Sequence, residues 1–139
     1  ALHLNRNILR KVPLFEKVSD GFLRELVLQL EPMVFVPGQA LMRRGETGRE
    51  LFFINKGTVE VLGPDDVEAI AVLSDGDFVG EMALLDSRPR ANTVRALDYC
   101  NVYALDRTAF ERALAEFPEI AEEVQVVADR RRAESSPDD

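Results

Sequence analysis

The segment from Asp77 to Ala96 contains residues whose types and spacing suit phosphate binding. Gly80 precedes Glu81 at the start of a short expected helix, and Arg90 follows ten residues after Gly80. The first amides of a helix lack backbone partners and suit an anion, and arginine offers a planar fork of donors that matches phosphate oxygens. Glu81 adds acceptor oxygens for a sugar hydroxyl. Together these residues predict a receptor for one sugar phosphate.

A purely structural interpretation of the same residues stays open. Glu81 and Arg90 can instead form a salt bridge at a surface turn, which would contribute little to stability. Gly-Glu and Pro-Arg pairs are common in isolation, so their spacing alone does not separate a binding site from a turn.

Helices are expected on both sides of this segment. Apolar residues between positions 2 and 12 have helical spacing, and Pro13 ends that helix. Ser19 suits the N-cap of a second helix, which ends near Glu31. Asp106 is a good N-cap for a third, and Pro118 fits the first turn of the last.

Between residues 33 and 105 the chain consists of short apolar segments separated by glycines. Strands are expected at 34–36, 40–42, 51–54, 58–62, 69–73, 91–96 and 101–105. Short strands at this spacing, with turn signals between them, predict an antiparallel roll. The predicted fold is α+β: a jelly-roll-like antiparallel β-roll flanked by N-terminal helices and two C-terminal helices, with a short helix at 81–85 inside the phosphate-binding segment.

Charge and composition exclude several functional classes. The 139 residues include 17 basic and 25 acidic side chains, and the net charge of −8 argues against a nucleic-acid partner and against attraction to anionic lipid. Cys100 and His3 are the only residues of their types, which excludes an internal disulfide and a cysteine- or histidine-rich metal site. Apolar runs are too short to span a bilayer, and no signal peptide is visible. We therefore expect a soluble fragment without direct membrane contact.

The phosphate-binding segment follows a longer motif. Its members are Gly80, Glu81, Ala83, Leu84, Arg90, Ala91 and Val94. This pattern resembles the cassette of cyclic-nucleotide-binding domains, in which a Phe-Gly-Glu-x-Ala/Ser-Leu block precedes an arginine, a small residue and a strand. One position departs from the family: Val79 stands where the family has Phe, with Phe78 one place earlier. A wider or less aromatic pocket wall is expected.

The similarity covers the chain from about Leu4 to Arg132. Within the family, the segments 26–32, 48–51 and 73–76 are most similar to cyclic-nucleotide-gated and hyperpolarisation-activated cation channels. The resemblance implies that residues 1–15 are the end of a linker from the pore and an N-terminal helix. It implies that residues 16–134 form the binding domain and 135–139 a disordered tail. The full-length protein would be a homotetrameric channel, with this domain on the cytoplasmic side of the plasma membrane.

The resemblance also assigns roles within the site. Arg90 would pair with the cyclic phosphate, aided by the amides of Ala83 and Ala91, while Glu81 and the Gly80 backbone would hold the ribose 2′-hydroxyl. An apolar wall beside the ligand would consist of Val61, Ala71, Leu73, Val79 and Met82. For Val61 and Leu73, ordinary core packing is nearly as good an explanation.

Arg130 on the last helix matches the position that caps the purine in channel members. Arg131 or Ala133 would substitute if the register is shifted. The alternative for Arg130 is a solvated helix end, where a cation complements the helix dipole.

The resemblance implies a sensor rather than an enzyme, with no cofactor or metal. Channel members that respond well to cyclic GMP commonly have Thr after the cassette arginine, and Ala91 lacks that hydroxyl. Cyclic AMP is therefore the expected ligand, with cyclic GMP binding more weakly. Binding would move the last helix, about 118–132, over the base and thereby gate the pore.

Three other functional classes fit the sequence less well. A cyclic-nucleotide-dependent transcription regulator shares this roll but would need a helix-turn-helix module after the last helix, and the sequence to Asp139 shows none. A kinase regulatory subunit would normally carry two such domains. A cupin-type enzyme needs several histidines for its metal, and His3 stands alone.

Overall fold

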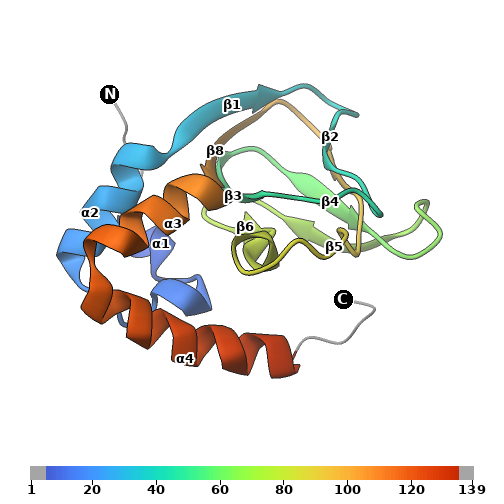
Figure 1. The fold of residues 1–139 in the computed structure, drawn as a ribbon. Coiled ribbons are helices and arrows are strands. Elements are labelled where there is room, and N and C mark those ends of the chain that lie inside the picture. The colour runs from blue at the N-terminus through green and yellow to red at the C-terminus, as the bar shows by residue number, and fades with distance from the viewer. Residues whose placement is uncertain (1–5, 135–139) are drawn as a thin grey trace.

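The chain folds into two four-stranded sheets that form a β-roll, with most of the helices gathered beside it (Figure 1). The computed structural model describes residues 6–134, so the predictions for residues 1–5 and for a disordered tail at 135–139 lie outside the described residues. In chain order the elements are α1 (Arg6–Leu9), the 3₁₀ helix η1 (Pro13–Phe15), α2 (Asp20–Gln29), β1 (Glu31–Phe35), β2 (Ala40–Met42), β3 (Glu50–Lys56), β4 (Val59–Leu62), β5 (Ala69–Leu73), β6 (Phe78–Val79), the 3₁₀ helix η2 (Glu81–Leu84), β7 (Val94–Ala96), β8 (Cys100–Asp106), α3 (Arg107–Glu116) and α4 (Pro118–Glu134). The predicted α+β roll is confirmed.

The two sheets enclose one apolar core. Their strand orders are β1-β8-β3-β6 and β2-β7-β4-β5, and every paired neighbour is antiparallel. Phe52 and Ile54 of β3 point into the roll, where the Phe35 ring meets the Phe52 ring edge-on at 6.2 Å between centroids. Val59 of β4 and Val94 of β7 close the core from the other sheet.

A second core lies between the first sheet and the helices. Leu51 and Phe53 alternate with the roll-facing residues of β3 and are fully buried against this helical side. The Phe15 ring of η1 lies 5.8 Å from that of Phe110 in α3. Each face of β3 therefore serves a different core, and burial of both faces fixes the position of the helices relative to the roll.

Local signals set the helix ends as the sequence predicts. The Ser19 hydroxyl accepts a hydrogen bond from the Phe22 amide, and the Asp106 carboxylate accepts one from the Thr108 amide. Pro118 begins α4. Within residues 6–134, none of the helices has both the length and the apolar run needed to cross a bilayer.

Four elements differ from expectation. Pro13 begins the turn η1 instead of only ending a helix, and the short strand β6 pairs with β3 without a strand signal of its own. Strand β7 begins at Val94, not at residue 91, because Arg90 exchanges backbone hydrogen bonds with residues 45 and 46. The expected helix at 81–85 is a single 3₁₀ turn.

The backbone at Gly57 requires glycine for two reasons, which two variants separate. Gly57 has φ +120°, and an added Cβ would lie 2.6 Å from Cys100 Sγ and 2.8 Å from the Tyr99 carbonyl. Gly38 has φ +89°, but an added Cβ there would have nothing within 4 Å.

Gly38→Ala should lower the free energy of unfolding by about 1–2 kcal/mol from backbone strain alone. Gly57→Ala should lower it by about 3 kcal/mol or more, because a clash is added. Urea unfolding measures both, and equal losses would contradict the packing argument.

Candidate functional site

The turn that opens the phosphate-binding segment is shaped by Gly80. Gly80 is the N-cap of η2 and has φ +96°. A Cβ there would lie 2.8 Å from Arg90 Nη1 and 2.8 Å from the Glu50 carbonyl oxygen. Only glycine combines this left-handed backbone with such a close approach. Gly80 therefore lets the cassette backbone lie directly against the arginine.

Arg90 is held in one place by its neighbours. Its Nη2 donates to the Glu50 carbonyl at 2.8 Å, and a Cβ on Gly48 would collide with its Nε and Cζ. Burial lowers the pKa of Arg90, and the nearby Glu50 and Glu46 carboxylates act in the opposite direction. The guanidinium still carries its charge near neutral pH, because arginine titrates far above that range.

Glu81 is buried and joins three segments of the chain. Its side chain lies on η2, and the residue is 5% exposed. One carboxylate oxygen accepts from Arg131 Nε of α4 at 2.8 Å, and the other accepts from the Leu14 amide of η1 at 3.4 Å. Glu81 thus pairs with Arg131 rather than with Arg90, so the surface salt bridge considered as an alternative does not form.

These residues border a cavity of about 310 Å³. The structure brings most of the predicted site residues to it. These are Val61, Val79, Gly80, Glu81, Met82, Ala83, Arg90 and Ala91. They come from β4, β6, η2 and the loop before β7, so the cavity lies where the second sheet meets the cassette.

Two predicted wall residues lie elsewhere. Ala71 is exposed on β5, where it pairs with Val61. Leu73 pairs with Val59 and packs against the core of the roll. Strand β5 is at the edge of its sheet, and neither Ala71 nor Leu73 lines the cavity.

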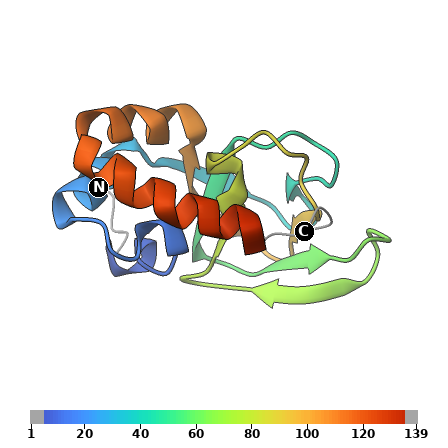
Figure 2. The ribbon, with the colours of Figure 1, turned by 60° about the horizontal axis from the view of Figure 1, so that its bottom comes forward.

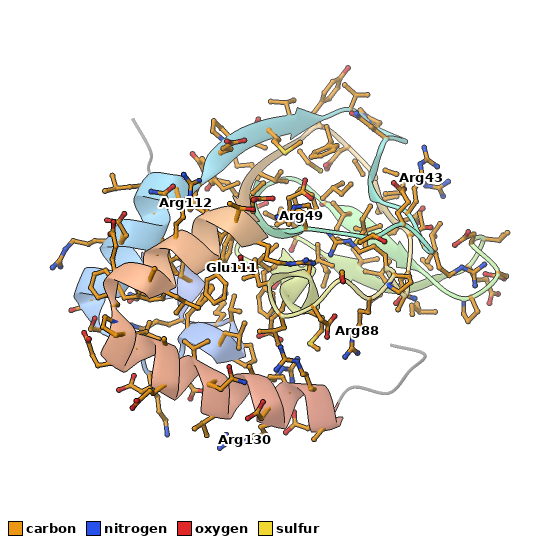
Figure 3. The ribbon with its side chains drawn as sticks, in the orientation of Figure 1. Arg43, Arg49, Arg88, Glu111, Arg112 and Arg130 are labelled. Atoms are coloured by element: carbon orange, nitrogen blue, oxygen red, sulfur yellow. The ribbon has the colours of Figure 1, made fainter. Side chains whose placement is uncertain are left out.

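The structure places Arg131, not Arg130, at the cavity. Arg130 is exposed on the outer side of α4 (Figure 3). It lines a separate groove of about 750 Å³ between η1 and α4, along with Leu14 and Val127. One residue turns a helical side chain by about 100°, which explains why the neighbouring arginine takes the inner position. Arg131 and Ala133 are the alternatives expected if the register of the last helix is shifted. Arg131 lines the cavity, whereas Ala133 is exposed and does not.

Several residues at the cavity were not predicted. They are Met42, Phe78, Arg88, Pro89, Asn92 and Val94. Arg88 could have been found from its position two residues before Arg90. Met42 comes from β2, and no local signal connects it with the cassette. Its place depends on the pairing of β2 with β7.

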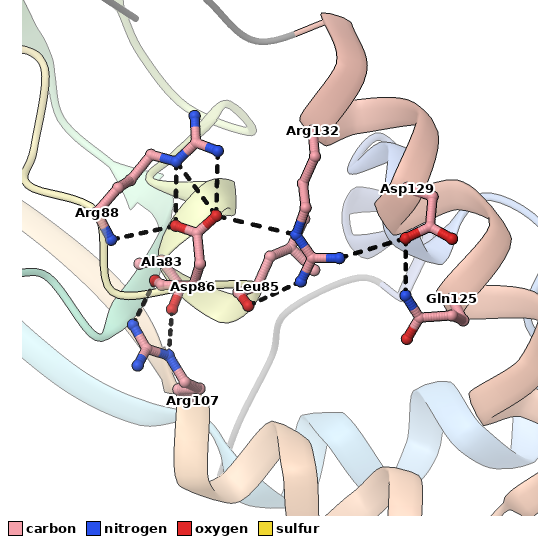
Figure 4. A network of polar contacts seen from close by, with 8 residues as sticks. All are labelled: Ala83, Leu85, Asp86, Arg88, Arg107, Gln125, Asp129 and Arg132. Carbon is pink, nitrogen blue, oxygen red and sulfur yellow. Dashed lines mark hydrogen bonds and ion pairs between the residues drawn. The ribbon is translucent and has the colours of Figure 1, made fainter. Parts of the chain in front are cut away.

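Arginines from two helices bind the carbonyl end of η2 (Figure 4). Arg107 of α3 donates from Nε to the Ala83 carbonyl at 2.7 Å and from Nη2 to the Asp86 carbonyl at 2.5 Å. Arg132 of α4 donates to the Leu85 carbonyl at 3.0 Å. The last carbonyls of a helix lack backbone partners, and cations are favourable there. The cassette is therefore anchored to both C-terminal helices (Figure 2).

The Asp86 carboxylate completes this anchor. Arg88 Nε lies 3.0 Å and 3.2 Å from its two oxygens, and Arg132 Nε lies 3.9 Å from Oδ2. Burial raises the pKa of the Asp86 carboxyl, but hydrogen bonds from Arg88 and the two arginine charges outweigh that effect and hold the pKa below its usual value. Asp86 is therefore ionised near neutral pH.

Known proteins share the sequence pattern and the fold of this chain. Residues 32–117 match the model of the family described as "Cyclic nucleotide-binding domain". The chain is 34% identical over 125 residues to cyclic nucleotide-gated channel alpha-3 from Homo sapiens. The match covers 86% of this chain and 18% of that protein. The chain thus spans less than a fifth of the length of that curated relative.

Two solved structures are similar over most of the chain. The N-terminal domain of a transcriptional regulator from Streptomyces coelicolor A3(2) has a TM-score of 0.79 and 28% identity, and the match covers 91% of this chain and 90% of that one. The C-linker/CNBHD of zELK channels, crystallized in the presence of cAMP, has a TM-score of 0.74 and 30% identity, covering 94% and 65%.

Proposed function

The chain belongs to the cyclic nucleotide-binding domain family, and on that premise we propose that it binds cyclic AMP, and cyclic GMP more weakly, in the cavity beneath η2. The cavity volume of about 310 Å³ falls in the range of small-molecule sites, roughly 300–1,000 Å³. It is bordered by apolar side chains from the roll and by charged groups from the cassette. That combination suits a ligand with one flat apolar part and one charged part.

The charge of the cavity carries the proposal. Its lining includes the cations Arg88, Arg90 and Arg131 and the anion Glu81. Arg131 pairs with Glu81, and Arg88 pairs with Asp86. Arg90 has no carboxylate within ion-pair distance among residues 6–134, and its guanidinium donates to the Glu50 carbonyl. One uncompensated guanidinium suits one monoanion, and a cyclic phosphate is a monoanion.

The remaining contacts follow from the cassette. The Ala91 and Ala83 amides would donate to the phosphate, with the Ala83 amide shared because it also donates to the Gly80 carbonyl at 3.1 Å. The ribose 2′-hydroxyl would bind Glu81, whose carboxylate has lone pairs beyond those used by Arg131 and Leu14.

We infer that three apolar side chains and one arginine of α4 contact the base. Val61, Val79 and Met82 line the cavity and would contact the purine or sugar. Arg131 replaces Arg130 as the residue of α4 that faces the base, because it is the arginine at the cavity.

We further propose that this domain is the cytoplasmic sensor of a tetrameric cation channel. The relatives at 34% identity are cyclic nucleotide-gated channels, and α4 contacts the cassette through Arg131 and Arg132. Ligand binding would shift the position of α4, and that shift would reach the pore through the N-terminal segment. A ligand can move such an equilibrium only by its differential affinity for the two states.

A second candidate is the sensor of a transcription regulator, which the Streptomyces coelicolor structure favours because its match covers 90% of that domain. The full-length gene separates the two. Six membrane spans and a pore loop upstream would support the channel, whereas a helix-turn-helix module downstream would support the regulator.

Removing the Arg90 guanidinium should weaken nucleotide binding strongly. Arg90→Ala should cost about 1.5–3 kcal/mol, the scale of hydrogen bonds to charged groups, or about 10- to 150-fold in Kd. Calorimetry with cyclic AMP measures the loss. Arg43→Ala is the matched control, because Arg43 is an exposed arginine outside the cavity and its removal should leave Kd unchanged. An unchanged Kd for Arg90→Ala would refute the phosphate assignment.

Ala91 should decide the preference between the two nucleotides. Ala91 lines the cavity, and Ala91→Thr adds a hydroxyl that can accept from the guanine amino group. The ratio of cyclic GMP to cyclic AMP affinity should rise by about threefold to tenfold, the value of one neutral hydrogen bond. Competition binding tests this, with the cyclic AMP affinity of the same variant as its internal control. Stronger cyclic GMP binding by the unaltered chain would contradict the cyclic AMP preference.

Cyclic AMP should change the distance between α4 and the roll. Cysteines can replace Val126 on α4 and Val67 beside β5, which are 61% and 74% exposed, while Cys100 is buried. Spin-label distances should shift when cyclic AMP is added, and the same pair carrying Arg90→Ala should not respond at the same concentration. A distance distribution that saturating cyclic AMP leaves unchanged would count against transmission through α4.

A further inference from the structure

Arg88 is a cavity cation whose partner lies outside the cavity. Its side chain borders the same space as Arg90, two positions later in the chain. Its guanidinium is held by both oxygens of Asp86, with Nε at 3.0 Å and 3.2 Å and Nη2 at 3.1 Å from Oδ2. Asp86 itself does not line the cavity. Arg88 therefore connects the ligand space to a carboxylate behind it (Figure 4).

The same carboxylate also receives an arginine from α4. Arg132 Nε lies 3.9 Å from Asp86 Oδ2, and its Nη2 donates to the Leu85 carbonyl at 3.0 Å. Its Nη1 lies 3.4 Å from Asp129 on the same helix. The end of α4 is thus fastened to the cassette beside the residue that holds Arg88.

Two guanidinium groups on one carboxylate compete. The distances show that Arg88 has the closer hold, with contacts near 3 Å against 3.9 Å for Arg132. The two cations also repel each other at this range. If Arg88 turned away, Asp86 would be left to Arg132, and the attachment of α4 to the cassette would strengthen.

An anion bound beside Arg90 would attract the Arg88 guanidinium away from Asp86. Resting on the proposed nucleotide binding, we propose that Arg88 exchanges Asp86 for the phosphate of the ligand, and that Asp86 then binds Arg132 more tightly. Arg88 is in this way a second phosphate contact. Asp86 is a positioning residue that converts occupation of the cavity into a firmer attachment of α4. The two events are linked, so each favours the other.

This exchange predicts a specific pattern of coupling. In the unaltered chain, Arg132 gains from ligand binding, so Arg132→Gln should weaken binding. Without Arg88, Asp86 pairs with Arg132 whether or not ligand is present. Arg132→Gln should then leave the affinity for the ligand unchanged. A salt bridge that is only structural would instead change stability, without making the effect of one arginine on affinity depend on the other.

The test is a double-mutant cycle on the Kd for cyclic AMP, measured by calorimetry on the full 139-residue chain. Arg88→Gln and Arg132→Gln should each raise Kd about twofold to fivefold, the range for partly exposed charge pairs. The double variant should bind as Arg88→Gln alone does. Arg130→Gln removes an exposed charge from the same helix and should leave Kd unchanged.

Further measurements keep each outcome decisive. Urea unfolding without ligand shows whether each variant is folded. Asp86→Asn provides a second test of the exchange, because Arg132→Gln should have no effect on Kd in a chain that lacks the Asp86 carboxylate. Additive effects of the two arginine substitutions, an unchanged Kd for Arg88→Gln, or equal effects of Arg130→Gln and Arg132→Gln would overturn the exchange while leaving nucleotide binding intact. If the unaltered chain binds neither cyclic nucleotide, the proposed function fails and the exchange with it.

Discussion

The buried carboxylate of Glu81 is the interaction on which the arrangement of the site depends. It joins η2 to α4 through Arg131 and to η1 through the Leu14 amide. A charge at 5% exposure is costly unless it is paired and hydrogen-bonded. The three segments must therefore stay together for the carboxylate to remain satisfied. Glu81 therefore links η1 and α4 to the cassette through one side chain.

The cassette is held by tertiary contacts more than by its own helix. A single 3₁₀ turn of four residues is too short to be stable in isolation. Its N-terminal side lies against Arg90, and its carbonyl end is bound by Arg107 and Arg132. The geometry of η2 is thus a property of how α3 and α4 pack on the roll.

An acidic protein here builds a cationic cavity. The chain carries a net charge of −8, yet arginines outnumber carboxylates in the cavity lining. Local placement outweighs the overall field, because Arg90 is half-buried beside Gly48 and Gly80 and partial burial strengthens its interaction with an anion. The acidic surface disfavours polyanions, and one sheltered guanidinium still suits a small monoanion.

The sequence by itself determined the roll, the helix ends and the chemistry of the cassette. Ser19, Asp106 and Pro118 set helix ends through contacts with residues next to them in the chain. The cassette can likewise be recognised from residues close in sequence, namely Gly80, Glu81 and the arginine that follows. Tertiary structure decided which side chains share the cavity. It brought in Met42 and Arg88, turned Arg131 inward in place of Arg130, and left Ala71 and Leu73 outside. These outcomes depend on strand pairing and on the rotation of α4 about its axis, which are fixed by burial of two separate cores, and no short stretch of sequence carries that information.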